Sequence, residues 1–284
     1  MNLPARMLIG AATLALCAGA TTPPPTDRIT VAFSDPSRPG LLHVGLVTGN
    51  IVVKGDNVKD VTVTTHPRGA GGGRPHGPRF DPDHDSEDAP PGLHRLPQQP
   101  SISVEEQNNR MSIGSPNVNR AADMEITVPT HTNLELSTVN DGNILVEGVD
   151  GEMEISDVNG AITLTGVGGS VVAHTVNGKV TATLARVATQ KPMAFTSLNG
   201  AVDVTLPAAA RANLKLRTDN GSVFTDFDLK VQPQGTSAIV EDTRQSGGRY
   251  RVEVNKVIYG SINGGGPEVE LRTFNGNVYV RRGS

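Results

Sequence analysis

The sequence predicts an all-β fold, namely a single-domain parallel β-solenoid (β-helix) of roughly nine-residue half-coils with one disordered insert. Three observations support this prediction. An apolar pattern of nine residues repeats in register, aromatic residues make up only 3% of the chain with no tryptophan, and 32 glycines and 20 prolines supply many turns. A core of small branched side chains suits thin, layered β-structure, and frequent glycine and proline suit tight corners.

Residues 153–179 repeat one pattern three times, as MEISDVNGA, ITLTGVGGS and VVAHTVNGK. Each unit has apolar side chains at positions one, three and six and glycine at position eight. Apolar residues two positions apart lie on one face of a strand, whereas a helix spaces them three and four apart. The Asn-Gly and Gly-Gly pairs mark turns, because both residue types tolerate positive φ. Each unit is therefore a short strand and a corner.

Two ways of joining these strands are open. Asn-Gly between short strands is a strong hairpin signal and allows an antiparallel meander. In-register repetition of one apolar pattern favours stacked coils instead, because each coil then places like side chains above like. We expect about two strands in each eighteen-residue coil and a rise of about 4.8 Å between coils.

The N-terminus, residues 1–20, is typical of a signal peptide. Arg6 supplies the positive charge, a short apolar stretch follows, and an A-x-A sequence ends at Ala20. An ordinary buried helix is the alternative. Cys17, the only cysteine, would carry a lipid if the chain were processed as a lipoprotein. Leu16 is bulky where that processing needs a small residue, so plain cleavage is favoured and the mature chain is expected in the periplasm or at the cell surface.

Neither the charge nor the hydropathy of the remaining chain indicates binding to nucleic acid or a segment that spans a membrane. The formal net charge of the whole chain is −4 and becomes −5 when Arg6 is removed with residues 1–20, so nothing indicates nucleic-acid binding. No later stretch is long and apolar enough to cross a membrane. We therefore expect no transmembrane segment in the mature chain.

The repeated pattern also sets the domain organisation. Residues 21–65 hold the N-terminal strands of the solenoid, and residues 101–284 hold its repeat domain. TGNIVVKG (48–55) closely matches DGNILVEG (141–148), which assigns both segments to one fold. A polar stretch, Gln232 to Gly248, separates the last coils.

Residues 66–100 interrupt the pattern with 8 prolines and 6 glycines. Such a segment cannot bury enough apolar surface to fold alone, so we expect a disordered insert. Histidine and carboxylate side chains gather there, but no spacing typical of a metal site appears, and we expect neither a metal nor a cofactor. The histidines are His66, His76, His84 and His94, beside Asp81, Asp83, Asp85, Glu87 and Asp88.

A recurring asparagine, in most units followed by glycine, is the most regular polar feature of the repeats. It could form a ligand-facing stripe, or a ladder in which stacked turn asparagines satisfy one another's amide groups. We favour the ladder, because the turn itself demands Asn before Gly. These structural turn residues are Asn140, Asn159, Gly160, Asn177, Gly178, Asn199, Gly200, Asn220, Gly221, Asn275 and Gly276.

Several phrases resemble a known family. LELSTVNDGNI, LPAAARANLKLRTDNGSVFTDFDL and SINGGGPEVELRTFNGNVYVRR are similar to a bacterial adhesin-type domain-of-unknown-function family with β-strand repeats, related to the head GIN domain. The resemblance covers nearly the whole mature chain. It implies an exported cell-envelope β-solenoid with no established catalytic activity, and it transfers no functional residues. The insert at 66–100 departs from the family pattern.

The function that we expect is a noncatalytic envelope scaffold or adhesin that binds glycan or protein. Polar side chains on its flat faces, such as Thr163, Thr165, Thr181 and Thr183, would make the contacts. One alternative is a carbohydrate-active β-helix enzyme. Another is a sensory or regulatory envelope protein that binds a partner at the open end of the solenoid. The sequence leaves the oligomeric state unknown and predicts Arg281 and Arg282 as a charged edge against stacking.

No catalytic constellation emerges from the sequence. Glu147, Glu152 and Glu154 occupy outward or corner positions, where polar residues need no special explanation. His174 also points outward and is expected at the surface. Ser261 lies in YGSING, which does not match the nucleophile pattern G-x-S-x-G. We therefore expect that the protein is not an enzyme.

Overall fold

The computed structural model describes residues 27–67, 102–114, 122–231, 238–242, 250–254 and 257–283. The predicted signal peptide at 1–20 and most of the predicted insert lie outside the described residues. His66 and Pro67, which the sequence assigned to the insert, end a strand instead. All regular elements in the described part of the chain are β-strands, so the all-β class is confirmed.

Twenty strands form one mixed sheet, and two more, β18 (Ala238–Asp242) and β19 (Tyr250–Val254), pair only with each other. The two-stranded pair lies within and beside the polar stretch expected to separate the last coils. The twenty strands are β1 (Asp27–Ala32), β2 (Gly40–Thr48), β3 (Ile51–Asp56), β4 (Asp60–Pro67), β5 (Ser103–Gln107), β6 (Arg110–Gly114), β7 (Ala122–Pro129), β8 (Thr132–Asn140), β9 (Ile144–Glu147), β10 (Asp150–Asp157), β11 (Ile162–Asn177), β12 (Val180–Leu184), β13 (Met193–Asn199), β14 (Val202–Leu206), β15 (Ala212–Asn220), β16 (Val223–Thr225), β17 (Lys230–Val231), β20 (Val257–Ile262), β21 (Glu268–Asn275) and β22 (Val278–Arg282).

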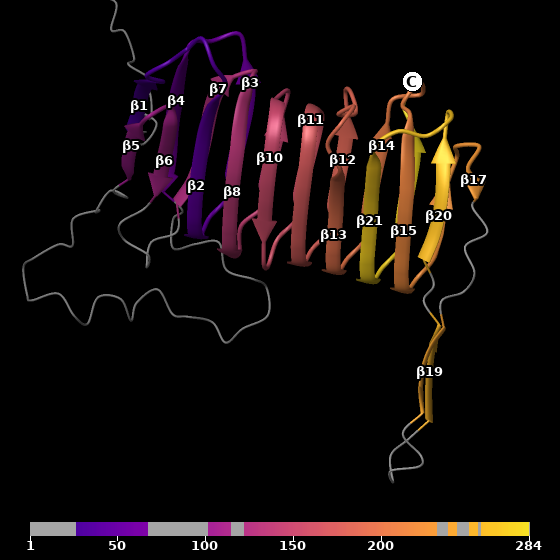
Figure 1. Cartoon of the computed structure of the whole chain (residues 1–284). Helices are drawn as coiled ribbons and strands as arrows, with labels where there is room; N and C mark the ends of the chain where they lie inside the picture. Colours follow the sequence, from indigo (N-terminus) through magenta and orange to yellow (C-terminus); the bar gives the residue numbers. More distant parts are fainter. Residues whose placement is uncertain are drawn as a thin grey trace, which may run out of the picture.

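The large sheet folds into two layers of parallel strands (Figure 1). The front layer runs β6, β2, β8, β10, the second half of β11, β13, β21 and β15. The back layer runs β7, β3, β9, the first half of β11, β12, β14, β22 and β16. We call one front strand and the back strand that follows it in the chain a rung. β11 belongs to two rungs, because its first half ends one and its second half begins the next.

Both ends of this stack are antiparallel. At one end β4 pairs antiparallel with β1 and β7, and β5 pairs antiparallel with β6. At the other end β20 pairs antiparallel with β15 and β17. The expectation of parallel strands throughout is therefore not met, since the sheet is mixed. A purely parallel stack would end in bare strand edges, and the antiparallel strands cover these edges except that of β16, which among the described residues pairs only with β22.

The rungs do not stack in chain order. β2 and β3 lie between the rung of β6 and β7 and the rung of β8 and β9. Near the C-terminus, β21 and β22 lie between the rung of β13 and β14 and the rung of β15 and β16. The first and last long rungs in the sequence are thus both inserted between neighbours from elsewhere in the chain.

The core lies between the two layers and consists of apolar residues stacked in register. In the back layer one such column is fully buried over most of its length, because β-branched side chains pack well above one another on a pleated surface. The column runs Ile51, Ile144, Ile162, Val180, Val202 and Val278. Outward positions alternate with these inward ones, so each layer presents a second, largely polar face to solvent.

Candidate ligand-binding faces

The recurring asparagines stand one above another at the corner where front strands turn toward the back layer. Asn177 Nδ2 donates to Asn159 Oδ1 at 2.8 Å, and Asn199 Nδ2 donates to Asn177 Oδ1 at 2.8 Å. Asn275 donates to Asn199 and Asn220 donates to Asn275, also at 2.8 Å. A longer contact of 3.5 Å joins Asn159 to Asn140. All six asparagines are therefore linked side chain to side chain.

The glycines at this corner allow the rungs to approach closely. A Cβ on Gly160 would lie 1.6 Å from the Gly142 carbonyl oxygen, and one on Gly178 would lie 1.9 Å from the Gly160 oxygen. Such distances are far inside van der Waals contact. None of the six stacked asparagines has a positive φ. Close backbone approach, rather than the positive φ expected of an Asn-Gly turn, explains these glycines at Gly160 and Gly178.

A buried row of hydroxyl groups runs beside the asparagines, two residues earlier in each rung. Each hydroxyl donates to a glycine carbonyl of a neighbouring rung, at 2.7–3.3 Å. Asp157 occupies the same position in its rung, is fully buried, and has no hydrogen-bond partner for either carboxylate oxygen. Burial raises the pKa of Asp157 to about 6, although the nearby backbone amides of Asn159 and Val158 oppose the shift. The hydroxyl residues are Thr138, Thr175, Ser197, Thr218 and Thr273.

The predicted threonines form a two-by-two array on the outward face of the back layer. Thr163 pairs in register with Thr181, and Thr165 pairs with Thr183. Thr165 and Thr183 are exposed, and the other two are half-buried. The structure therefore brings together the four threonines that the sequence placed on one face.

A charged cluster adjoins this array. Asp203 accepts hydrogen bonds from Arg281 Nε at 2.8 Å and from Lys179 Nζ at 3.2 Å. Burial raises the pKa of Asp203, but these two cations more than offset it and hold the pKa below its usual value. The Arg281 guanidinium also lies 5.2 Å from the centre of the Tyr279 ring, which stacks on Phe224 at 5.2 Å.

Arg281 and Arg282 do not form a charged edge. Their strand, β22, pairs with β14 on one side and with β16 on the other, so it lies inside the back layer. The prediction assumed that the C-terminal strand is the last strand of the stack, whereas β22 lies between β14 and β16.

The three glutamates considered for catalysis do not gather. Glu147 lies on β9 in the back layer, whereas Glu152 and Glu154 lie on β10 in the front layer. The latter two line a shallow hollow of about 320 Å³ together with Glu135, which the sequence patterns did not single out. Glu135 accepts a hydrogen bond from Arg110 at 2.7 Å, and Glu152 pairs with Lys191.

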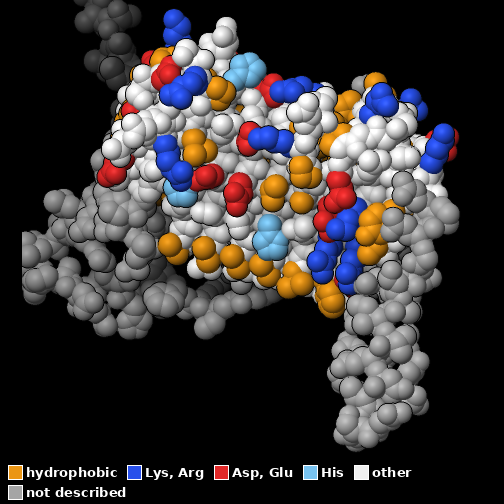
Figure 2. Space-filling model, in the orientation of Figure 1, with side chains coloured by type: hydrophobic (Ala, Val, Ile, Leu, Met, Phe, Trp, Pro, Cys, Tyr) orange, Lys and Arg blue, Asp and Glu red, His pale blue; other side chains and the backbone are white. Residues whose placement is uncertain are grey.

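The front layer presents its outward face in Figure 2. His174 is exposed there, as predicted, and its Nδ1 lies 2.8 Å from Thr196 Oγ1. Apolar side chains form a row along the lower edge of this face (Figure 2). They immediately precede the stacked corner residues, and we call them the apolar row: Val47, Val139, Val158, Val176, Leu198 and Phe274. Four of the six, Val47, Val139, Leu198 and Phe274, are 41–45% exposed.

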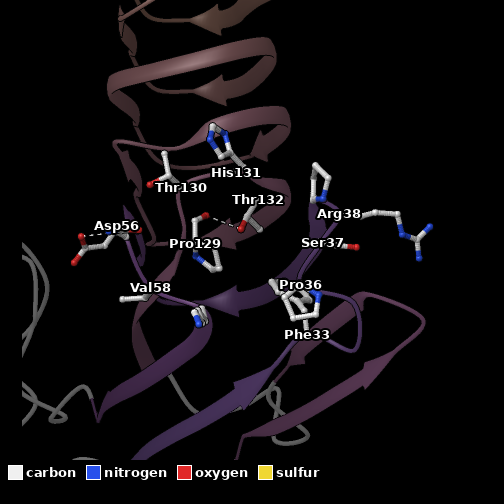
Figure 3. A pocket seen from close by; sticks show the side chains of 14 residues that line it. Phe33, Pro36, Ser37, Arg38, Asp56, Val58, Pro129, Thr130, His131 and Thr132 are labelled. Carbon is white, nitrogen blue, oxygen red and sulfur yellow. Dashed lines mark hydrogen bonds between the residues drawn. The ribbon is translucent and has the colours of Figure 1, made fainter.

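A second hollow, of about 580 Å³, opens at the corner near the N-terminal end of the stack (Figure 3). Three segments line it: residues 33–40 before and at the start of β2, residues 56–59 after β3, and residues 129–132 between β7 and β8. Thr132 Oγ1 donates to the Pro129 carbonyl at 2.7 Å and fixes the last of these corners. Arg38 lies on the rim of this hollow, and its Nε lies 2.6 Å from Oδ2 of Asp35.

Ser261 lies within β20, opposite Asn213 of β15 and Lys230 of β17. It therefore occupies a paired strand position, whereas a nucleophile elbow is a sharp turn between a strand and a helix. Of the insert histidines only His66 is described. Within the described ranges no group of three or more metal-ligating side chains occurs, and no helix there could span a membrane.

Comparison with known proteins gives only distant likenesses. No family model matches the chain, and no curated protein matches it. A candidate cell adhesion protein from Clostridium sporogenes has 11% identity and a TM-score of 0.43, covering 91% of this chain and 100% of that one. A candidate adhesin from Bacteroides fragilis has 12% identity and a TM-score of 0.38, covering 92% and 98%. At these values neither likeness carries an argument about the function of this chain.

Proposed function

We propose that this chain is a noncatalytic, exported cell-envelope β-solenoid that acts as an adhesin or surface scaffold and binds glycan or protein through its outward faces. The observation that carries the proposal is the register of the rungs. It aligns outward polar side chains into extended arrays, such as Thr163 with Thr181 and Thr165 with Thr183. A flat, regular face of this kind suits an extended ligand that crosses several rungs.

Separate observations support the solenoid fold, the export, the family membership and the structural role of the asparagines. The two runs of parallel pairs support a solenoid, and the composition of residues 1–20 supports export. The quoted phrases support membership of the adhesin-type family. The side-chain hydrogen bonds among the stacked asparagines support a structural role for them and for the glycines beside them, because each inner asparagine already uses one amide donor and one acceptor within the row.

The pairing of acidic side chains favours a binding role over catalysis. A glycosidase needs two carboxyl groups free to act on one bond. In the front hollow Arg110 holds Glu135 and Lys191 holds Glu152, which leaves Glu154 as the one glutamate there without an ion pair among the described residues. Partner binding at an end of the front layer is also disfavoured, because antiparallel strands cover that layer at both ends.

The test is a binding screen of residues 21–284 against a glycan array and cell-envelope fractions, beside the same chain with residues 68–100 deleted. We expect saturable binding by both forms, since the outward faces are common to them. Loss of binding on deletion would move the function to the insert. Absence of binding by either form would refute the adhesin proposal.

A further inference from the structure

We infer that the front layer holds a site for a carboxylate-bearing sugar of an acidic glycan, formed by Arg272, Arg217 and the exposed ring of Phe274. This inference rests on the proposed function and names a ligand class and a place for it. It arises from the C-terminal part of the front layer, where Lys and Arg side chains gather over β21 and β15 (Figure 2).

The two arginines stand side by side on neighbouring parallel strands. Arg217 of β15 and Arg272 of β21 are register partners, so their backbones lie about 4.8 Å apart. Like charges placed directly opposite destabilise a sheet. The two guanidinium groups therefore repel each other unless anions neutralise them.

The carboxylates of the described chain satisfy only one member of this pair. Arg217 Nη2 donates to Asp219 at 2.9 Å, while its Nε is buried without an acceptor. The Arg272 side chain is exposed and makes no hydrogen bond or ion pair within the described part of the chain. Its guanidinium is thus an available fork of donors, and such a fork matches the two oxygens of a carboxylate.

Further hydrogen-bonding groups continue the row across the sheet. Thr196 of β13 is the register partner of Arg272 on its other side, and His174 of β11 is the partner of Thr196. The Nδ1 of His174 is occupied by the Thr196 hydroxyl at 2.8 Å, which leaves Nε2 available. Four adjacent rungs therefore offer polar groups in one line, which suits several hydroxyl groups of an oligosaccharide.

Two exposed apolar side chains, Phe274 and Leu198, lie directly beside this row of polar groups, and we call them the apolar ledge. Phe274 follows Arg272 by two residues, so its ring projects from the same face and is 45% exposed. Leu198, 44% exposed, precedes the corner asparagine of the neighbouring rung. A pyranose has one face of C–H groups, which pack against an aromatic ring because the ring face is electron-rich. The ledge and the guanidinium together match a sugar that carries a carboxylate.

The surrounding charges select for a single carboxylate over a polyanion. Glu268 and Glu270 lie on the same strand as Arg272, and Lys215 neutralises Glu270 at 3.2 Å. The chain as a whole carries a net charge of −4. A nucleic acid or polyphosphate would meet this repulsion along its length, whereas an oligosaccharide with a single uronic acid places its one charge at the arginines.

Isothermal titration of residues 21–284 with an oligosaccharide that carries a single galacturonic acid tests the inference, beside the same oligomer with that carboxylate methyl-esterified, which lacks the charge. We expect the acid form to bind, and esterification to weaken binding on the order of tenfold or more, because a bidentate ion pair is lost. Arg272→Gln should weaken binding of the acid form by a similar factor. Since the Arg272 side chain makes no hydrogen bond or ion pair within the described part of the chain, this variant should fold normally, which a thermal melt would verify.

Arg28→Gln is the matched control, because it removes the same charge from exposed Arg28 of β1, at the opposite end of the molecule. It should change the affinity less than twofold. Equal binding of the acid and ester forms, or unchanged affinity of Arg272→Gln, would overturn the inference. So would stronger binding of a nucleic acid than of the oligomer. Binding of neutral glycans alone would overturn it but leave the proposed function standing, whereas no binding to glycans or envelope fractions would refute the proposed function itself.

Discussion

At the scale of single residues, Asp157 is the exception in an otherwise uniform row. Five other rungs place a hydroxyl at this position and donate it to a glycine carbonyl. A carboxylate cannot donate, and an unpaired buried charge is costly. The Asp157 Oδ2 and the Gly142 carbonyl oxygen both border the place where a Gly160 Cβ would stand. A protonated Asp157 could donate where the other rungs use a hydroxyl.

The first prediction is that Asp157 makes the protein less stable as the pH rises. Because the folded-state pKa of about 6 lies above the ordinary 3.8, this residue's contribution is fully present below pH 4 and is lost as the pH rises through 6. The loss is at most about 3 kcal/mol in the free energy of unfolding. Asp157→Thr should therefore gain stability relative to the natural chain at pH 7 and lose that gain near pH 4.

Urea unfolding from pH 4 to pH 8 would measure this difference. Asp157→Asn, which does not titrate, serves as the control and should show the same weakened pH dependence. If the natural chain and Asp157→Thr keep a constant difference in stability over this range, the carboxylate does not titrate as described.

A second residue-scale prediction concerns the stacked asparagines. Asn177→Ala removes two side-chain hydrogen bonds, and water can satisfy the freed groups of Asn159 and Asn199 because these side chains are exposed, so we expect a loss of about 1 kcal/mol. Asn220→Ala, at the end of the row, removes one such bond and should cost less. Chemical denaturation would measure both. Unchanged stability together with impaired ligand binding would instead support a ligand-facing stripe.

At the scale of elements, the corners between front and back strands depend on close backbone contact. Gly178→Ala would put a Cβ 1.9 Å from the Gly160 carbonyl oxygen, and the rungs would have to separate. We expect a loss of about 2–4 kcal/mol or failure to fold. Gly114→Ala is the control, since a Cβ there meets nothing within 4 Å. Circular dichroism melts would compare the two, and equal melting temperatures would contradict the close-contact explanation.

At the scale of the whole molecule, the last rung in the sequence, β21 and β22, lies inside the stack and not at its end. β21 and β22 contact both the rung of β13 and β14 and the rung of β15 and β16. Deleting residues 266–284 should therefore expose β15 and β16 to hydrogen exchange, although neither strand is deleted. Deleting residues 21–32, which removes β1 from an end of the sheet, should have only a local effect. Retained protection of β15 in the first deletion would argue against the inserted order.

The sequence determined the all-β class. It also gave the eighteen-residue offset of the central rungs, in which Asn177 stacks on Asn159 and Ala161 bonds to Asn143. These features are local, because the two-residue alternation and the corner residues act within one rung. The sequence also grouped the four threonines, since their rungs are consecutive in the chain and in space.

Only the tertiary structure decided the order of the rungs, the antiparallel ends and the residues that meet across distant rungs. Arg217 and Arg272 became neighbours because β21 inserts beside β15, and Asn275 donates to Asn199 across a separation of 76 residues. The physical reason is the sameness of the repeats. An apolar pattern of small branched residues fits equally well above any other rung, so the pattern specifies that rungs stack but not which rung lies beside which.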